Sequence, residues 1–201
     1  KKQSQYANFP VLNANITDEE GFLLFRPYHI FNLHGIRIAV IGLMSEDAWQ
    51  AVSPSSKPGL KFHDPVQVAR QWVPELRKQA DLVVAVTHAG LQQDLDFAKE
   101  VSGVDVITGG HSHTKLDQAQ LVKNANANGI NGTLVHQAYR WGVYVGKIDL
   151  YIENRKITHY SSGLVEINEK WNVDSSDPIE QYLNPYIQRI DKEMNIVVGT
   201  S

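Results

Sequence analysis

The sequence predicts an α/β fold with a parallel sheet, and two features support this prediction. Apolar runs of strand length at 82–86 and 104–108 are typical of segments buried on both faces of a parallel sheet. The stretch between them has the spacing of a helix. A strand, a helix and a second strand in succession form a right-handed crossover, so the two strands should run parallel.

Composition places the chain among ordinary globular proteins. It has 201 residues, of which 42% are hydrophobic and 20% are charged, so it can bury a core. The net charge of -3 gives no electrostatic case for binding a nucleic acid polymer or an anionic membrane. The absence of Cys excludes disulfides, thiolate metal ligands and Cys nucleophiles. Apolar runs such as 36–44 are too short to span a bilayer.

The first predicted strands form a hairpin. Apolar runs at 28–33 and 36–43 are joined by His34-Gly35, which suits a tight two-residue turn. A short apolar run at 9–12 precedes this hairpin. The stretch 53–59 is predicted to be a loop because it is rich in Ser, Pro and Gly.

Two helices are predicted in the middle of the chain. The first begins after Asp64, which can cap it, with Pro65 at its first position and apolar residues at helical spacing as far as Leu76. Pro74 should kink or split this helix because proline has no N–H group. The second helix is predicted over 91–101, between the two buried strands.

After these elements the polar, Asn-rich stretch 115–131 is predicted to be a loop. Three strands should follow, at 133–138, 143–153 and 156–166. Asn154-Arg155 reads as the hairpin turn between the last two strands. A bulge is expected near Gly146, where the alternation of apolar residues is imperfect.

The C-terminal region is predicted to begin with a helix. Asp177-Pro178 has the character of a helix start, and the helix should run to about Met194 with an interruption at Pro185. The last residues, 196–201, are expected to be the first strand of a further domain.

Three histidines follow the two parallel strands. His88 lies in the segment THAG, and His111 and His113 lie in the segment GGHSHT. The carboxyl ends of parallel strands meet at one edge of a sheet, so these side chains should converge. Residues two apart on extended backbone point the same way, so His111 and His113 can share a site. Neutral imidazole binds borderline divalent metals, so we predict a metal site here.

Other residues compete less well for this role. A single histidine after a strand is more often a satisfied polar residue than a ligand, but the joint pattern favours metal binding. Glu46 and Asp47 follow the strand at 36–43 and offer carboxylate oxygen, although a solvated loop pair is the commoner explanation. The remaining histidines have no partner at ligand spacing, and we predict that they are not ligands: His29, His34, His63, His136 and His159.

At these motifs the chain resembles the calcineurin-like metallophosphoesterases. More narrowly, it resembles the bacterial 5′-nucleotidase group, which includes UDP-sugar hydrolases and 2′,3′-cyclic-nucleotide phosphodiesterases. The matching segments occur in the family's order and span most of the chain: FPVLNANI (9–16), GIRIAVIGL (35–43), VVAVTHAG (83–90), DVITGGHSHT (105–114) and VHQAYRWGVYVGKIDL (135–150).

The resemblance implies a fold and a domain organisation. The family's catalytic domain is a four-layered α/β/β/α sandwich, and this chain looks like its C-terminal half with a C-terminal linker helix. Residues 1–175 would be that half, 176–195 the linker helix and 196–201 the start of a missing C-terminal domain. The chain would then begin inside the longer protein.

The resemblance also implies an activity. Members hydrolyse phosphomonoesters or phosphodiesters of nucleotides with a metal-bound hydroxide and two divalent ions, which are Mn, Zn, Fe or Co. By resemblance, His88 and His111 would bind one ion and His113 the other, with no further cofactor. A periplasmic or secreted location is implied as well.

The departure from the family lies in the motifs of its first half. The DxH, GDxxD and GNHE motifs are absent from this sequence, so no catalytic residue is assigned. Three imidazoles supply no anionic bridge between two cations, which repel each other strongly. We therefore expect this chain alone to bind at most one ion well and to be nearly inactive. Apolar surface left without the first half would favour a homodimer or a domain swap.

Two other functions fit the same histidines. One is a mononuclear hydrolase, in which three histidines hold a single ion that activates water. The other is a non-catalytic α/β metal-binding module. Metal stoichiometry and turnover separate these from the binuclear phosphohydrolase.

Overall fold

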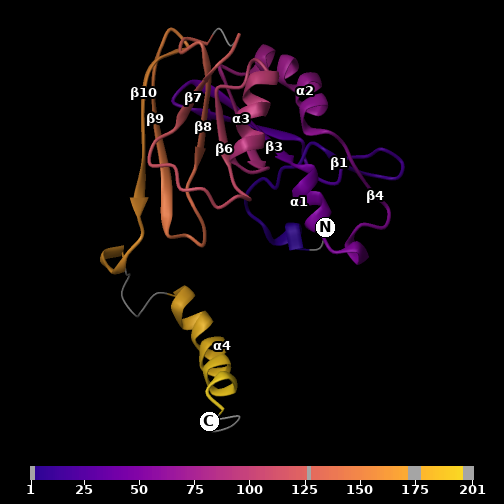
Figure 1. Ribbon diagram of the computed structural model, residues 1–201, viewed down its shortest axis with the longest axis vertical. Coiled ribbons are helices and arrows are strands. Elements are labelled where there is room, and N and C mark those ends of the chain that lie inside the picture. The colour runs from indigo at the N-terminus through magenta and orange to yellow at the C-terminus, as the bar shows by residue number, and fades with distance from the viewer. Residues whose placement is uncertain (1–2, 126–127, 172–177, 197–201) are drawn as a thin grey trace. The chain divides into compact units, whose positions relative to one another are not determined.

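The computed structural model describes residues 3–125, 128–171 and 178–196 of the chain, which divides into the units Lys1–Glu166 and Ile167–Ser201 (Figure 1). In chain order, the first unit contains η1 (Gln3–Tyr6), β1 (Ile16–Asp18), β2 (Tyr28–Leu33), β3 (Ile36–Met44), α1 (Glu46–Ala51), η2 (Pro54–Ser56), β4 (Leu60–Phe62), α2 (Pro65–Gln79), β5 (Leu82–His88), α3 (Leu91–Glu100), β6 (Val106–Gly109), β7 (Gln120–Lys123), β8 (Gly132–Gln137), β9 (Tyr144–Glu153) and β10 (Lys156–Glu166). The second unit contains η3 (Glu169–Trp171) and α4 (Pro178–Met194).

A mixed six-stranded sheet forms the centre of the first unit, in the order β2-β3-β5-β6-β8-β7. The four inner strands are parallel, and β2 and β7 pair antiparallel at the two edges. Helix α3 connects β5 to β6, as the crossover rule requires. The predicted α/β class and the predicted parallel strands are confirmed.

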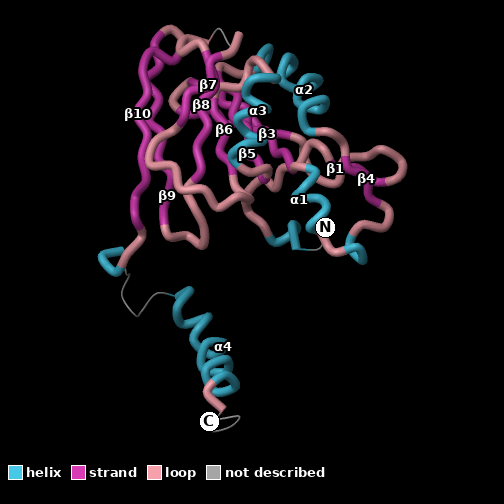
Figure 2. The backbone as a smooth tube through the Cα atoms, viewed as in Figure 1, coloured by secondary structure: helices cyan, strands magenta, loops and turns pink. Residues whose placement is uncertain are grey.

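Helices cover one face of this sheet (Figure 2). Ile41, Val83 and Ile107 from three neighbouring strands are fully buried on that face. They pack in one cluster with Leu76 of α2 and Phe97 of α3. Burying a side chain of this size contributes roughly 1.5–3 kcal/mol, so this layer supplies much of the stability of the unit.

The β9–β10 hairpin lies beside β7 and β8 in Figure 1 and covers part of the other face. Its turn at Asn154 and Arg155 has left-handed backbone at both positions, which confirms the predicted tight turn. The prediction of a bulge near Gly146 is wrong, because Gly146 pairs with Leu164 in regular register. A Cβ at Gly146 would lie 2.8 Å from Nδ1 of His136 on β8. Close approach of the two strands therefore explains this glycine.

The predicted turn at His34-Gly35 and the predicted helix cap at Asp64 are confirmed. Residues His34 and Gly35 have φ of 51° and 83° and form the turn between β2 and β3. Asp64 caps α2 by accepting a hydrogen bond from the backbone N–H of Gln67. Pro74 does not split α2, which runs unbroken to Gln79. Pro74 itself is exposed, so water can satisfy the backbone group it leaves, while neighbouring Val73 is buried in the core.

Four other predictions need correction or lie outside the described residues. The loop predicted at 115–131 contains β7, which pairs with β8 at the sheet edge. Pro185 does not interrupt α4, a helix without buried residues. The predicted cap at Asp177 and the strand predicted at 196–201 fall on residues 172–177 and 197–201, which are outside the described part of the chain.

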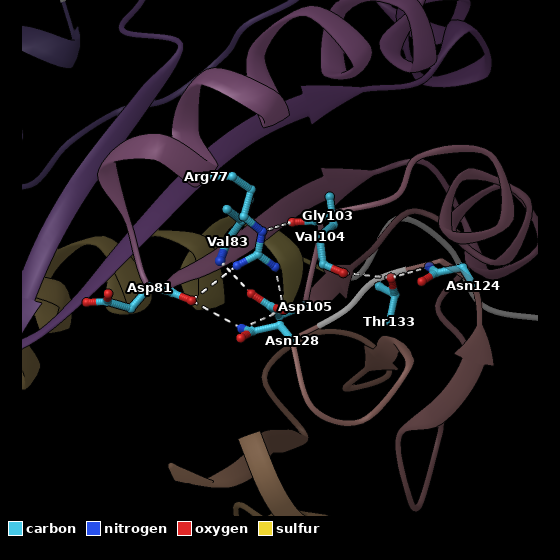
Figure 3. Close-up of polar contacts among 9 residues, drawn as sticks. All are labelled: Arg77, Asp81, Val83, Gly103, Val104, Asp105, Asn124, Asn128 and Thr133. Atoms are coloured by element: carbon cyan, nitrogen blue, oxygen red, sulfur yellow. Dashed lines mark hydrogen bonds and ion pairs between the residues drawn. The ribbon is translucent and has the colours of Figure 1, made fainter. Parts of the chain in front are cut away.

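A buried ion pair ties α2 to the amino ends of the parallel strands (Figure 3). The carboxylate of Asp105 is fully buried and accepts hydrogen bonds from Nη2 of Arg77 at 2.5 Å and from the backbone N–H of Val83 at 2.7 Å. Nδ2 of Asn128 donates to the same carboxylate at 3.1 Å. Nearby, the hydroxyl of Thr133 donates to the carbonyl of Val104. This network stabilises the edge of the sheet opposite the predicted metal site.

Candidate metal centre at the carboxyl edge of the sheet

The parallel strands bring the predicted site residues to one edge. His88, the last residue of β5, pairs in register with Met44 at the end of β3. Gly109 at the end of β6 pairs with Gln137 at the end of β8. The segment that contains His111 and His113 follows directly, and the carbonyl of Gly110 accepts a hydrogen bond from the backbone N–H of Gly90, just beyond His88.

Two of the three predicted ligands lie next to each other. The imidazole rings of His88 and His111 have centroids 5.0 Å apart and planes 72° apart. Partial burial, followed by the nearby charges of His111 and His113, lowers the pKa of His88 below its usual value. Both effects favour the neutral imidazole, which is the form that binds a metal ion.

His113 is placed differently from the extended geometry that the sequence suggested. His111 and His113 have left-handed backbone, with φ of 74° and 52°, so the loop turns sharply instead of running straight. The ring of His113 lies against Trp141, with centroids 6.5 Å apart. Arg140 places its guanidinium 4.0 Å above the ring of Trp141, and Trp141 is 80% exposed.

The donor set fits part of a metal site. His88 and His111 are adjacent, partly accessible imidazoles, as two ligands of one ion would be. Within the described residues, no three His, Asp or Glu side chains lie close enough together to hold a metal ion. The residues present therefore fit an ion whose remaining ligands come from elsewhere.

Glu46 and Asp47 do not complete the cluster. They begin α1 after β3, and both are exposed. Oδ2 of Asp47 accepts a hydrogen bond at 2.6 Å from Nε2 of Gln93 on α3. The hydroxyl of Ser45 accepts from the backbone N–H of Ala48, which caps this short helix.

The other histidines have separate environments. Nε2 of His63 lies 2.8 Å from the hydroxyl of Thr17, and the ring of His159 packs against that of Tyr151. His29 packs against Phe31, and His34 lies in the turn of the first hairpin. His136 is 3% exposed, and burial lowers its pKa.

A buried polar network beneath the histidine loop was not predicted. Asp94 of α3 is fully buried, and its carboxylate accepts hydrogen bonds from the hydroxyl of Thr87 at 2.7 Å and from Nε2 of Gln137 at 3.3 Å. Nε2 of Gln137 also donates to the carbonyl of Gly110, and its Oε1 accepts from the hydroxyl of Ser112. Burial raises the pKa of Asp94, although the two hydrogen bonds oppose that shift. The Gly109-Gly110 pair was the available signal, because Gly109 lies directly over this carboxylate.

A cavity of about 390 Å³ opens beside His88. Val86 and Gly42 of the sheet line it together with Leu12 and Pro10 of the N-terminal segment. It lies on the sheet face opposite α2 and α3, since Gly42 and Val86 are in register there and the neighbouring residues Ile41 and Ala85 belong to the helix-covered core.

Known proteins resemble this chain over its whole length. The chain is 33% identical to a 5′-nucleotidase of Vibrio cholerae over 239 aligned positions, which cover 100% of the chain and 43% of that protein. It is 31% identical to protein UshA of Yersinia enterocolitica, with 98% of the chain and 40% of UshA covered. No protein-family model matches the chain.

Solved structures give the same result. A 5′-nucleotidase precursor from Thermus thermophilus superposes with a TM-score of 0.80 and 28% identity, covering 95% of this chain and 40% of that one. The calcineurin-like phosphoesterase YfkN of Bacillus subtilis shares the fold, with a TM-score of 0.73.

The chain spans only about two fifths of the length of the 5′-nucleotidases that it matches. Those relatives are therefore more than twice as long as the region that they share with the chain. The shared region contains the strand order and the histidine loop described above. The chain belongs to the 5′-nucleotidase family, a family of hydrolases.

Proposed function

We propose that the chain is part of a nucleotide phosphohydrolase and that His88, His111 and His113 are its contribution to a binuclear metal site. The adjacency of the His88 and His111 rings, 5.0 Å between centroids at the carboxyl edge of the sheet, is the observation that carries this proposal. Relatives named 5′-nucleotidase support a nucleotide substrate. Residues 1–175 would be the C-terminal half of the metallophosphoesterase domain, 176–195 a linker helix and 196–201 the start of a further domain.

The chain's own residues have a defined part in this chemistry. His88 and His111 would hold one divalent ion and His113 would contribute to a second, while the cavity beside His88 leaves space for a phosphate ester. Partial burial lowers the pKa of His88, which favours the neutral imidazole that binds a metal ion. When bound, two divalent ions stabilise charge on the phosphoryl oxygens and activate the attacking water.

Metal stoichiometry tests the proposal. After loading with Mn²⁺ or Zn²⁺ and removal of the excess, we expect at most one ion per chain by elemental analysis. A variant with both His88→Ala and His111→Ala should retain none. The matched control carries His34→Ala and His159→Ala, two exposed histidines that lie in hairpins outside the site. Equal metal content in variant and control would refute the histidine ligands.

Turnover of p-nitrophenyl phosphate tests the second part. The isolated chain should hydrolyse it poorly, because it supplies no carboxylate bridge between two ions. One tightly held ion together with ready turnover would contradict the binuclear proposal and favour the mononuclear hydrolase.

A periplasmic or secreted location is part of the proposal. One structural relative is described as a 5′-nucleotidase precursor. Within the described residues, no helix is long and apolar enough to cross a membrane. Secretion of a tagged form, followed by fractionation of the host cell, measures the location directly.

We also propose that the isolated chain self-associates. Val86 lies in the middle of the sheet on β5 and is 47% exposed, and Phe31 on the same face is 37% exposed. A second copy placed over this apolar face would remove it from water. Sedimentation across a concentration series should show a dimer, and a monomer at every concentration would contradict the proposal.

A further inference from the structure

We infer that Asp94 and Gln137 are positioning residues, which fix the loop 110–114 and thereby the imidazoles of His111 and His113. This inference rests on the proposed function in that it assigns those imidazoles to a metal site. Neither Asp94 nor Gln137 contacts the space beside His88, so both act through the loop.

The contacts of Gln137 carry the argument. It ends β8 and is 2% exposed. Its Nε2 donates to Oδ2 of Asp94 at 3.3 Å and to the carbonyl of Gly110 at 3.1 Å. Its Oε1 accepts from the hydroxyl of Ser112 at 3.0 Å and from the backbone N–H of Thr114 at 3.2 Å. One side chain thus holds the loop before, between and after the two histidines.

Asp94 fixes the orientation of that amide. An acceptor at Asp94 requires that the amide nitrogen of Gln137 face it, and the oxygen then faces Ser112 and Thr114. The hydroxyl of Thr87, next to His88, donates to the other oxygen of Asp94 at 2.7 Å. The carboxylate therefore links the strand that ends in His88 to the loop that contains His111.

Burying the carboxylate of Asp94 and holding the loop in a strained backbone both cost free energy, which indicates that Asp94 does more than fill space in the core. The buried carboxylate of Asp94 accepts from a neutral hydroxyl and a neutral amide, and burying a charge with neutral donors is unfavourable relative to an apolar side chain of similar size. The loop holds two non-glycine residues, His111 and His113, in left-handed backbone, a conformation that persists only where surrounding contacts enforce it. Gly109 completes the fit, since a Cβ there would collide with Oδ2 of Asp94.

The experiment exchanges the carboxylate and the amide between positions 94 and 137. Asp94→Asn leaves a single side-chain oxygen to accept from the two donors, Thr87 and Gln137, and Gln137→Glu places two carboxylates against each other. The double variant D94N/Q137E restores a donor and an acceptor at this contact. Thr133→Val is the matched control, because it removes a buried hydroxyl that donates at 2.7 Å from the opposite end of the same strand.

Three quantities are measured on the full chain: the free energy of unfolding, the hydrogen exchange of the backbone amides of 110–114, and the dissociation constant for Zn²⁺. Each single variant should exchange these amides faster and bind Zn²⁺ about tenfold more weakly, as is usual when outer contacts of a metal site are lost. The double variant should lie closer to the wild type than either single variant. The control should lose stability without changing the loop or the affinity.

The outcomes separate the two proposals. If the single variants destabilise the chain as Thr133→Val does but leave loop exchange and Zn²⁺ affinity unchanged, the positioning role is refuted. If the wild type shows no Zn²⁺ binding that depends on His111, while loop exchange still responds to the variants, the proposed function fails and the positioning of the loop stands. Should the single variants fail to fold, Thr87→Val is a milder change, because it removes only the hydroxyl that donates to the same carboxylate.

Discussion

The hydroxyl oxygen of Ser112 lies 3.0 Å from the backbone nitrogen of Leu91, the first residue of α3. Gly90 precedes this helix and has no side chain with which to cap it. The residue between the two histidines of the loop therefore caps the helix that follows His88. The helix and the histidine loop depend on each other through this bond.

Replacement of Ser112 by Ala should destabilise the chain by about 1 kcal/mol, because the cap of α3 is lost. Chemical denaturation measures this difference. Ser102→Ala is the control, since Ser102 is exposed just after the other end of the same helix. If both variants unfold at the same denaturant concentration as the wild type, the hydroxyl of Ser112 has no capping role.

Two arginines on α2 should differ strongly when each is replaced by Met. Arg77→Met leaves the fully buried Asp105 without its cation and should cost about 3–5 kcal/mol. Arg70, two turns earlier, pairs with Glu100 at 3.2 Å, and both side chains are more than half exposed. Arg70→Met should cost less than about 1 kcal/mol. Equal losses of unfolding free energy would contradict the importance of burial for this ion pair.

Protonation of Asp81 should lower the free energy of unfolding of the chain in acid. Its side chain is 6% exposed and accepts from the backbone N–H of Arg37 at 2.8 Å and from Nη1 of Arg155 at 2.7 Å. The bond to the Arg37 backbone, aided by both guanidinium groups, lowers the pKa of Asp81 to about 2 from an ordinary value of 3.8. Because the folded-state pKa is the lower one, this stabilisation is complete above the ordinary value and is lost as the pH falls toward 2.

Asp81→Asn tests this dependence. The unfolding free energy of the variant should be lower than that of the wild type by on the order of 1 kcal/mol at pH 6, after allowance for solvent screening. The difference should shrink as the pH approaches 2. Glu75→Gln serves as a control, because the pair of Glu75 with Lys78 is exposed. A difference for Asp81→Asn that stays constant with pH would refute the linkage.

Local signals in the sequence predicted local structure well. The His34-Gly35 turn and the Asp64 cap depend on backbone conformation and on contacts within three residues, so short patterns reveal them. Strand β7 was missed because its four residues contain only Leu121 and Val122 as apolar side chains, and pairing with β8 decides their structure.

The site was predicted only in part for the same reason. His88 and His111 are marked by strand ends and glycines, and the sheet topology brings them together. Asp94 was not recognised, since a carboxylate in the first turn of a helix usually faces water. Its partner Gln137 lies 43 residues away, and only the folded sheet places the two side chains in contact.

The same long-range effect governs Gly146, and a pair of glycine substitutions tests it. Gly146→Ala would place a Cβ 2.8 Å from Nδ1 of the buried His136, so we expect a loss of about 1–3 kcal/mol from overpacking. Gly163→Ala on β10 of the same hairpin meets nothing within 4 Å and should be neutral or slightly stabilising. In a double-mutant cycle with His136→Ala, the loss at Gly146 should largely disappear, because the smaller side chain leaves room for the new methyl group. An undiminished loss in that cycle would mean that backbone strain in β9, and not contact with β8, makes glycine necessary at this position.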